Sequence, residues 1–310
     1  MIHRPLIILI AAASLAAGQA AATKSWIPAR TADGQPDLQG VWTNATITPF
    51  ERPAELANKP FLTEKEAAEL EKQSAKSKVD RPPAAGDVGT YNQVWFDSGT
   101  KVVGTRQTSL VVDPPDGKVP VKPAAEAKRD YDLAHIGDSY EHMSVWDRCI
   151  TRGVPGRMFP AGYNNAYQIL QSPGYVVIMS EMIHDARVIP LDGRAHAPAD
   201  VRSWDGDSRG HWDGNTLVVD VTGFNGMAWL DRAGNFASDS LHVVERYSML
   251  DANTINYEAT IEDPKTFSRP WKINVILYRH REKDARLLEF KCVEFTEELI
   301  YGDLRKKAGK

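Results

Sequence analysis

Residues 241–262 read LHVVERYSMLDANTINYEATIE, and this stretch decides the fold class. Leu241–Met249 and Thr254–Glu262 are rich in the β-branched and aromatic residues that strands favour. Between them, Asp251-Ala252-Asn253 combines residues that favour a turn. The stretch therefore predicts two antiparallel strands joined by a short turn.

The same alternation of strands and turns extends in both directions from this hairpin. Further strands are expected at Arg106–Val112, Ala166–Gln171, Tyr175–Ile189, Thr216–Thr222, Trp271–His280 and Arg286–Phe295. Successive strands with short connections predict an antiparallel meander that closes as a barrel or packs as a sandwich. The chain shows no βαβ alternation and no GxGxxG motif, so we expect no nucleotide cofactor.

The predicted hairpin also carries charged side chains. Val243, Glu245 and Tyr247 share one face of the first strand, and Glu258 belongs to a polar row of the second. Polar rows in an antiparallel meander normally face water. We therefore expect both glutamates on the solvent side, without a catalytic role.

Two Gly-x-Trp triplets refine the architecture. They are Gly40-Val41-Trp42, at the start of the first expected strand, and Gly210-His211-Trp212. A Gly-x-Trp at the start of the first strand resembles the signature of lipocalin-like barrels, in which the tryptophan plugs one end. Two ordinary tryptophans at strand entries are the alternative. The sequence predicts a mainly β protein with a lipocalin-like barrel or sandwich, and such barrels hold one small ligand.

The first 22 residues have the three parts of a signal peptide in order. Arg4 lies in the leading region, an apolar run extends from Leu6 to Ala17, and Ala20-Ala21-Ala22 offers an A-x-A cleavage pattern. The run is shorter than the roughly 20 apolar residues that span a bilayer, so an uncleaved anchor is the less favoured alternative. We expect a periplasmic or secreted protein that does not span the membrane.

After the signal peptide, 1–22, we divide the chain into an irregular N-terminal region, 23–142, and an antiparallel β domain, 143–310. In the N-terminal region, Thr63 and Glu66 form a capping box that opens a charged surface helix extending to about Ser77. A second, short helix is expected near Ala124–Leu133.

The charge balance and the histidine spacing exclude several classes of partner. The chain carries 37 basic and 41 acidic residues, for a net charge of −4. Nucleic-acid-binding proteins show a basic excess, so no nucleic-acid partner is expected. The eight histidines include no H-x-H or H-x-x-x-H pair, and no metal site is favoured unless distant strands assemble one. We expect no cofactor, and the sequence leaves the oligomeric state open.

The two cysteines, Cys149 and Cys292, are far apart in the sequence. In an oxidising compartment they are expected to form one disulfide that closes a long loop. The alternative is that each serves as a small buried apolar residue.

Several blocks resemble a large family of exported bacterial β-rich proteins whose functions are mostly uncharacterised. The blocks are PDLQGVWTN, SLVVDPPDGKVP, YNNAYQI, GYVVIMSEMIHDARVIPLDGR, DSRGHWDGNTLVVD and TIEDPKTFSRPW. The resemblance covers nearly the whole mature chain and implies export and a β-rich fold, but no activity. The family usually reads Cys-His-Glu-Gly-Asn near the C-terminus, whereas this chain has Cys292-Val293-Glu294-Phe295-Thr296.

The densest polar cluster lies within the expected strand Tyr175–Ile189. Strand alternation places Glu181, Asp185 and Arg187 on one face and His184 on the other. We identify Glu181, His184 and Asp185 as candidate acid/base residues and Arg187 as a candidate ligand-binding residue, because buried charges need partners or a purpose. A solvent-facing ladder of ion pairs is the alternative.

Two further clusters are candidates for binding a ligand. Tyr163, Asn164 and Asn165 offer amide and hydroxyl groups, although such residues also suit a turn. In the stretch 207–212, expected to be a loop at the barrel mouth, Arg209 and His211 offer a guanidinium and an imidazole.

These clusters support three classes of function. The first is a periplasmic enzyme using cofactor-free acid/base chemistry on a small, partly apolar metabolite, as a lyase, isomerase or hydrolase does. The second is a non-catalytic, lipocalin-like carrier of an apolar small molecule. The third is a structural or interaction domain of the cell envelope. Titratable groups that converge in a closed pocket favour the enzyme, and an apolar lumen favours the carrier.

Overall fold

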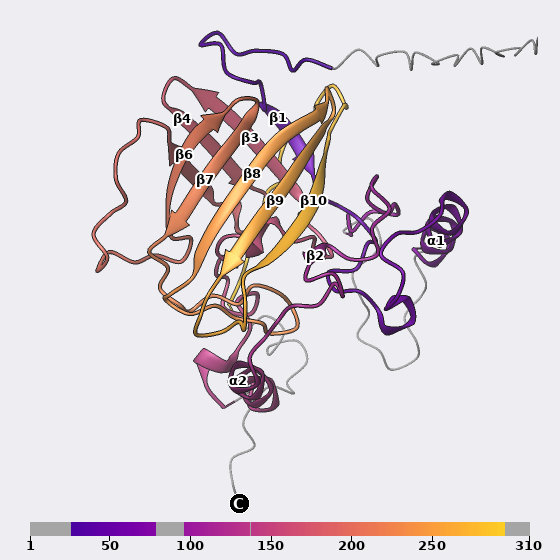
Figure 1. Ribbon diagram of the computed structural model, residues 1–310, viewed down its shortest axis with the longest axis vertical. Helices are drawn as coiled ribbons and strands as arrows, with labels where there is room; N and C mark the ends of the chain where they lie inside the picture. The colour runs from indigo at the N-terminus through magenta and orange to yellow at the C-terminus, as the bar shows by residue number, and fades with distance from the viewer. Residues whose placement is uncertain (1–25, 79–95, 137, 295–310) are drawn as a thin grey trace, which may run out of the picture.

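A computed structural model describes residues 26–78, 96–136 and 138–294 (Figure 1). The strands are β1 (Gly40–Thr43), β2 (Val111–Asp113), β3 (Ala166–Ser172), β4 (Tyr175–Ser180), β5 (Ala186–Pro190), β6 (Asp207–Asp213), β7 (Thr216–Thr222), β8 (His242–Asp251), β9 (Thr254–Glu262) and β10 (Trp271–Arg279). The helices are α1 (Glu64–Ser77) and α2 (Pro123–Ala134), with short 3-10 turns at Ala54–Leu56, Tyr140–His142, Gly156–Met158 and Met182–His184. The expected signal peptide, 1–22, lies outside the described residues.

The strands form one antiparallel sheet that curves into a nearly closed barrel, which confirms the predicted fold class. The strand order is β5-β4-β3-β1-β10-β9-β8-β7-β6, and β2 pairs with β10 beside this path. The two edge strands approach each other at Gly210 of β6. A Cβ atom there would lie 2.6 Å from Leu191 Cδ2 and 2.8 Å from Ile189 Cγ2. Only a glycine therefore allows β6 to pack this closely against the end of β5.

The two ends of the barrel differ. At the upper end in Figure 1, short hairpin turns join β3 to β4, β6 to β7 and β8 to β9. Trp42 is fully buried beside this end, and the Arg279 guanidinium lies 4.0 Å from the centre of its ring. Arg279 Nη1 also donates to the Gln39 carbonyl at 2.6 Å. The first Gly-x-Trp triplet thus places a fully buried tryptophan beneath an arginine near this end of the barrel.

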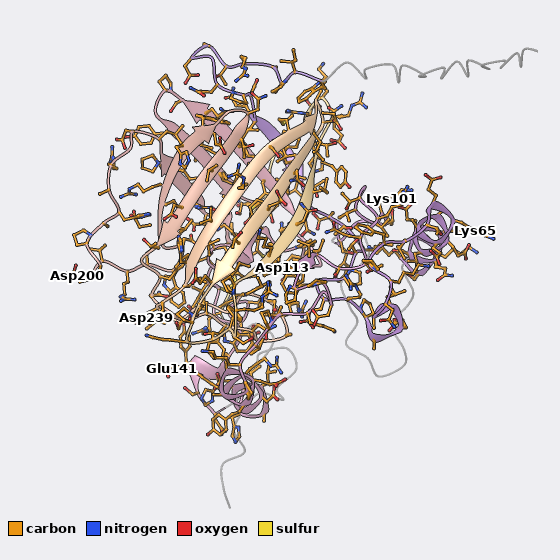
Figure 2. All side chains as sticks on the ribbon, viewed as in Figure 1. Lys65, Lys101, Asp113, Glu141, Asp200 and Asp239 are labelled. Atoms are coloured by element: carbon orange, nitrogen blue, oxygen red, sulfur yellow. A yellow bond between two sulfur atoms is a disulfide. The ribbon has the colours of Figure 1, made fainter. Side chains whose placement is uncertain are left out.

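Longer segments collect at the opposite, lower end of the barrel, where α2 lies (Figure 1). The segments that leave β1, enter β3, join β7 to β8 and join β9 to β10 all meet there. In Figure 2, Glu141 marks this end, while Lys65 and Lys101 mark the side of the barrel where α1 lies. No helix in the described ranges is long and apolar enough to cross a bilayer.

Helix α1 forms where the sequence predicts it. The Thr63 hydroxyl accepts a hydrogen bond from Glu66 N at 3.3 Å, and Glu66 Oε2 accepts one from Thr63 N at 2.9 Å. This reciprocal pair satisfies two amide groups that the first helical turn leaves without partners. Burial on the helix is confined to Ala67, which packs with Leu62 and Val102 apart from the main core. The capping box and the surface location are therefore both confirmed.

The predicted disulfide between Cys149 and Cys292 is present, with a Cα–Cα distance of 5.7 Å. It ties the segment after α2 to the segment after β10. The expected strand Arg286–Phe295 is wrong, because residues 286–294 form no strand and residue 295 lies outside the described ranges. The expected strand Arg106–Val112 is also largely wrong, since only Val111–Asp113 forms a strand, β2, and Gln107 makes an isolated bridge to Phe61.

The expectation of one long strand at Tyr175–Ile189 is wrong as well. The chain reverses after Ser180, and β4 pairs with β5 as a hairpin. Ile183 and His184 hold the turn with φ angles of 65° and 57°. Positive φ is unfavourable for a β-branched residue such as isoleucine, so the residue at position 183 does not predict a turn. The stretch 207–212, expected as a loop, is instead part of β6.

Candidate functional site

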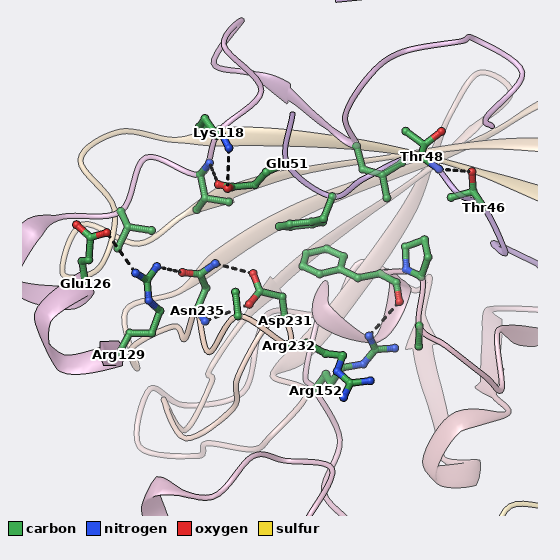
Figure 3. A pocket seen from close by; sticks show the side chains of 18 residues that line it. Thr46, Thr48, Glu51, Lys118, Glu126, Arg129, Arg152, Asp231, Arg232 and Asn235 are labelled. Atoms are coloured by element: carbon green, nitrogen blue, oxygen red, sulfur yellow. Dashed lines mark hydrogen bonds and ion pairs between the residues drawn. The ribbon is translucent and has the colours of Figure 1, made fainter. Parts of the chain in front are cut away.

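A cavity of about 660 Å³ lies at the lower end of the barrel (Figure 3). Its walls come from five separate parts of the chain: 46–51 after β1, 110–121 around β2, helix α2, 152–161 before β3, and 231–235 between β7 and β8. The connecting segments, rather than the barrel strands, therefore shape this cavity. Its volume falls in the range of roughly 300–1,000 Å³ that is typical of small-molecule sites.

Arg152 is the most buried charged residue of the lining, with 5% of its surface exposed. Its Nη1 donates to the Phe159 carbonyl at 3.0 Å, and its Nη2 reaches the Arg157 carbonyl at 3.5 Å. Within the described ranges, no carboxylate lies within ion-pair distance of it. Burial lowers the pKa of this guanidinium, because a low-dielectric environment disfavours the charged form.

A second arginine lies close to the first. The guanidinium carbons of Arg152 and Arg232 lie 5.4 Å and 5.8 Å from the centre of the Trp146 ring. Figure 3 shows the two side chains next to each other on one wall of the pocket. Arg232 is exposed and, like Arg152, forms no ion pair with any described residue. An aromatic face attracts guanidinium groups, and Trp146 thus holds two positive charges at this wall.

Asp231 faces the same pocket with 9% of its surface exposed. Asn235 donates to it twice, from the backbone N at 3.1 Å and from Nδ2 at 2.6 Å. Arg129 of α2 in turn donates to Asn235 Oδ1 at 3.1 Å, so the amide is fixed from both sides. Burial raises the pKa of Asp231 above its ordinary value, although the hydrogen bonds from Asn235 oppose this.

The opposite wall combines a charged rim with an apolar surface. Glu51 accepts hydrogen bonds from Val119 N at 2.7 Å and from Lys118 Nζ at 3.4 Å. Inside this rim, the rings of Phe50 and Phe159 lie 4.5 Å apart. The pocket therefore offers polar groups and an aromatic surface to the same ligand.

The predicted acid/base residues lie elsewhere, in and beside the β4–β5 turn. Glu181 is 3% exposed, and its two oxygens accept hydrogen bonds from Asn164 Nδ2 at 2.8 Å and Leu288 N at 2.7 Å. His184 is exposed, and Asp185 pairs with Arg157 at 2.8 Å. Strand alternation does not apply in this turn, so the predicted shared face of Glu181, Asp185 and Arg187 is wrong.

Arg157 links this turn to the segment before β6. Besides Asp185, its Nη2 contacts Asp205, which also accepts a hydrogen bond from Thr151 at 3.0 Å. Burial raises the pKa of Asp205, and the neighbouring Asp185 carboxylate adds to the effect, against the pull of Arg157. The three charged groups hold the β4–β5 turn against the chain that enters β6.

Arg187 points into the barrel, but it serves an internal network. It donates to Glu245 Oε2 at 2.5 Å and to Ser208 Oγ at 2.8 Å. The hydroxyls of Tyr247 and Tyr257 both donate to Glu245 Oε1 at 2.9 Å. The expectation that Glu245 faces water is therefore wrong: its exposure is 0%. These large side chains occupy the interior between β5, β8 and β9.

The remaining predicted ligand-binding residues are also dispersed. Asn165 is buried and donates from Nδ2 to Asp97 Oδ1 at 2.8 Å, while Tyr163 is half-buried. Arg209 donates to Asp207 Oδ1 at 2.6 Å, and His211 is exposed. None of the nine predicted catalytic or ligand-binding residues lines the 660 Å³ cavity.

Sequence reasoning missed the residues that do line the pocket. Arg152 stands in the stretch ITRGVPGRMFP, 150–160, where arginines interrupt an apolar, glycine- and proline-rich segment. That interruption is the signal that could have found it, since a charge among buried residues needs a partner. Asp231 and Asn235 carry no comparable signal, because DRAGN is an ordinary turn sequence.

The described part of the chain holds no group of three or more His, Cys, Asp or Glu residues that could bind a metal ion. In comparisons with known proteins, no protein-family model and no curated protein matches this sequence. Among solved structures, a secretory abundant heat soluble protein from Ramazzottius varieornatus is similar at 9% identity and a TM-score of 0.26. That match covers 44% of this chain and 87% of the other.

Proposed function

We propose that this protein binds a small, partly apolar organic molecule in the pocket at the lower end of the barrel. The observation that carries the proposal is the cavity of about 660 Å³, in which an aromatic pair faces fixed polar groups. Ligand sites typically combine a mostly apolar lining with a few well-placed polar groups. Trp42 and Arg279 pack together at the upper end, whereas the cavity lies at the lower end, so we expect a ligand to enter from the lower side.

Blocking the pocket tests this proposal. Ala233 is exposed and lines the cavity, so Ala233→Trp fills the entrance without disturbing the core. The matched control is Ala199→Trp, at an exposed alanine in the segment between β5 and β6. We expect the neutral dye Nile red to bind the wild type and the control, and Ala233→Trp to reduce its affinity at least tenfold. Equal binding by all three proteins would place the ligand elsewhere.

A second candidate function, acid/base catalysis, is favoured by Asp231. A buried carboxyl with a raised pKa that faces a pocket is suited to exchange protons with a substrate. Native mass spectrometry of the purified protein identifies any retained molecule, which is then incubated with wild type and with Asp231→Asn. Conversion by the wild type alone supports an enzyme. A ligand that both proteins bind and leave unchanged supports a carrier.

We also infer export to an oxidising compartment. The disulfide between Cys149 and Cys292 supports this, because such bonds persist outside the reducing cytosol. The signal-peptide pattern of residues 1–22 supports it independently. Intact-mass measurement of the exported protein is expected to give an N-terminus near Thr23. A mass that includes Met1 would contradict the inference.

A further inference from the structure

We propose that the ligand of this pocket is an organic monoanion whose carboxylate binds Arg152 and Arg232 while its apolar body packs on Phe50 and Phe159. This inference rests on the binding function proposed above and adds the chemical class of the ligand. It follows from three features of the pocket: an unpaired buried cation, a second cation beside it, and the balance of charge in the lining.

The first feature is the state of Arg152 compared with the other buried arginines. Arg157 and Arg187 are 5% exposed and pair with carboxylates. Arg52 and Arg148 are similarly buried, form no ion pair with described residues, and lie outside the pocket lining. Arg152 alone among these five combines burial, a place in the cavity wall and the lack of an ion pair with any described residue; Asp231 attracts it from beyond ion-pair distance. An unpaired buried charge is costly, so an anion that enters the pocket gains a strong partner.

The geometry of Arg152 leaves donors for such an anion. A guanidinium has five N–H groups in a fixed plane, and the two hydrogen bonds of Arg152 go to main-chain carbonyls, one of them at 3.5 Å. A carboxylate can accept two parallel hydrogen bonds from a guanidinium. Because both carbonyl contacts are neutral, they orient Arg152 without cancelling its charge.

Arg232 supplies the second positive charge. Its guanidinium shares the Trp146 ring with that of Arg152, at 5.8 Å and 5.4 Å from the ring centre. Two cations held near one ring repel each other, and an anion between them removes that repulsion. The Trp146 ring thus helps to organise this wall for a negative group.

The net charge of the residues that line the pocket indicates which ligand charge would complement it. Four lining residues are basic and three are acidic, namely Lys118, Arg129, Arg152 and Arg232 against Glu51, Glu126 and Asp231. Lys118 pairs with Glu51, and Arg129 pairs with Glu126 and, outside the lining, with Asp130. Among the lining residues this leaves two cations and the Asp231 carboxylate. The remaining charge of +1 matches a monoanion. A dianion would meet repulsion from Asp231, so we expect carboxylates to bind better than phosphate monoesters.

Three naphthalene compounds test the inference by isothermal titration calorimetry at pH 8 and low ionic strength. They are 1-naphthoate, the neutral 1-naphthalenemethanol and the dianionic 1-naphthyl phosphate. A hydrogen-bonded charge is expected to favour the naphthoate over the alcohol by about 10- to 100-fold. The phosphate is expected to bind more weakly than the naphthoate.

Two arginine variants assign the effect to the pocket. Arg152→Gln is expected to abolish the preference for naphthoate over the alcohol. The matched control is Arg148→Gln, which removes an equally buried, unpaired arginine outside the pocket and should keep the preference. Arg232 is exposed, so Arg232→Gln is expected to fold normally and to weaken naphthoate binding about three- to tenfold.

The outcomes separate the two proposals. Equal affinity of the wild type for naphthoate and the alcohol would overturn the anion inference and leave the binding function standing. If neither compound binds, the anion inference fails, and Nile red binding by the wild type and by Ala233→Trp decides the binding function. If Arg152→Gln does not fold, Arg232→Gln decides: unchanged naphthoate affinity overturns the inference, and a loss specific to naphthoate supports it.

Discussion

The ion pair between Arg187 and Glu245 makes a sharp prediction about stability. Glu245 is fully buried and accepts three hydrogen bonds, from Arg187, Tyr247 and Tyr257. Replacing it in Glu245→Leu keeps a side chain of similar bulk but removes the acceptor of all three donors. The largest consequence falls on Arg187, which is 5% exposed and keeps only Ser208 as a partner among the described residues.

The magnitude follows from these contacts. Leaving a buried charge without its partner typically costs about 3–5 kcal/mol. Each tyrosine hydroxyl that loses its acceptor adds about 1 kcal/mol or more, unless it finds a new partner. We therefore expect Glu245→Leu to lower the free energy of unfolding by about 5–7 kcal/mol. In the double variant Glu245→Leu/Arg187→Met no unpaired charge remains, so most of the 3–5 kcal/mol should return.

Urea unfolding at pH 7, followed by far-ultraviolet circular dichroism, measures both effects. The matched control is Arg246→Ala, next in sequence but on the outer face of β8. Arg246 pairs with Asp213 at 2.9 Å with both side chains largely exposed, so its loss is expected to cost at most about 1 kcal/mol. A loss below 1 kcal/mol for Glu245→Leu would refute the reasoning. So would a double variant that is no more stable than the single one.

Two further predictions concern covalent and pH-dependent stability. Replacing Cys149 and Cys292 by serine opens a loop of 143 residues and should lower the free energy of unfolding by about 2–5 kcal/mol, measured by urea unfolding with and without reductant; an unchanged midpoint would contradict it. Burial raises the pKa of Tyr167 to about 12 and raises those of Tyr247 and Tyr257 well above their ordinary value. Above pH 10 the unfolded chain releases these protons and the folded one keeps them, so stability is full below pH 10 and falls by up to about 4 kcal/mol per pH unit above it. Absorbance at 295 nm should show the three tyrosines ionising only as the protein unfolds, and full ionisation in a folded protein at pH 11 would disprove this.

The sequence predicts the barrel because its information there is local and repeated. The hairpin of β8 and β9 alternates buried and exposed residues around a recognisable turn, and Thr63 caps α1 through the partner expected three residues later. Trp42 of the first Gly-x-Trp triplet is fully buried in the first strand. Each of these features depends on residues close together in the chain.

The errors have equally specific causes. The turn between β4 and β5 contains no glycine, proline or asparagine, and Ile183 and His184 adopt positive φ against their preference. The rule that polar residues in a meander usually face water predicts a solvent-facing Glu245, and the rule fails here because the glutamate has partners inside the barrel. Its partner Arg187 lies 58 residues earlier in the sequence. The pair can therefore be recognised only from the folded structure, in which β5 and β8 both contribute side chains to the barrel interior.

The location of the pocket also depends on contacts between residues that are far apart in the sequence. Arg187, Glu245 and two tyrosines occupy space inside the barrel, and Arg279 packs over Trp42 at the upper end. Space for a ligand therefore arises where connecting segments meet, at the lower end. Connecting segments carry no hydrophobic periodicity. Strand patterns in the sequence therefore predict site residues on the strands and give no signal of the residues that line the pocket. In a barrel filled in this way, a charge in an apolar connecting segment, such as Arg152, is a better guide to the binding site than polar residues within the strands.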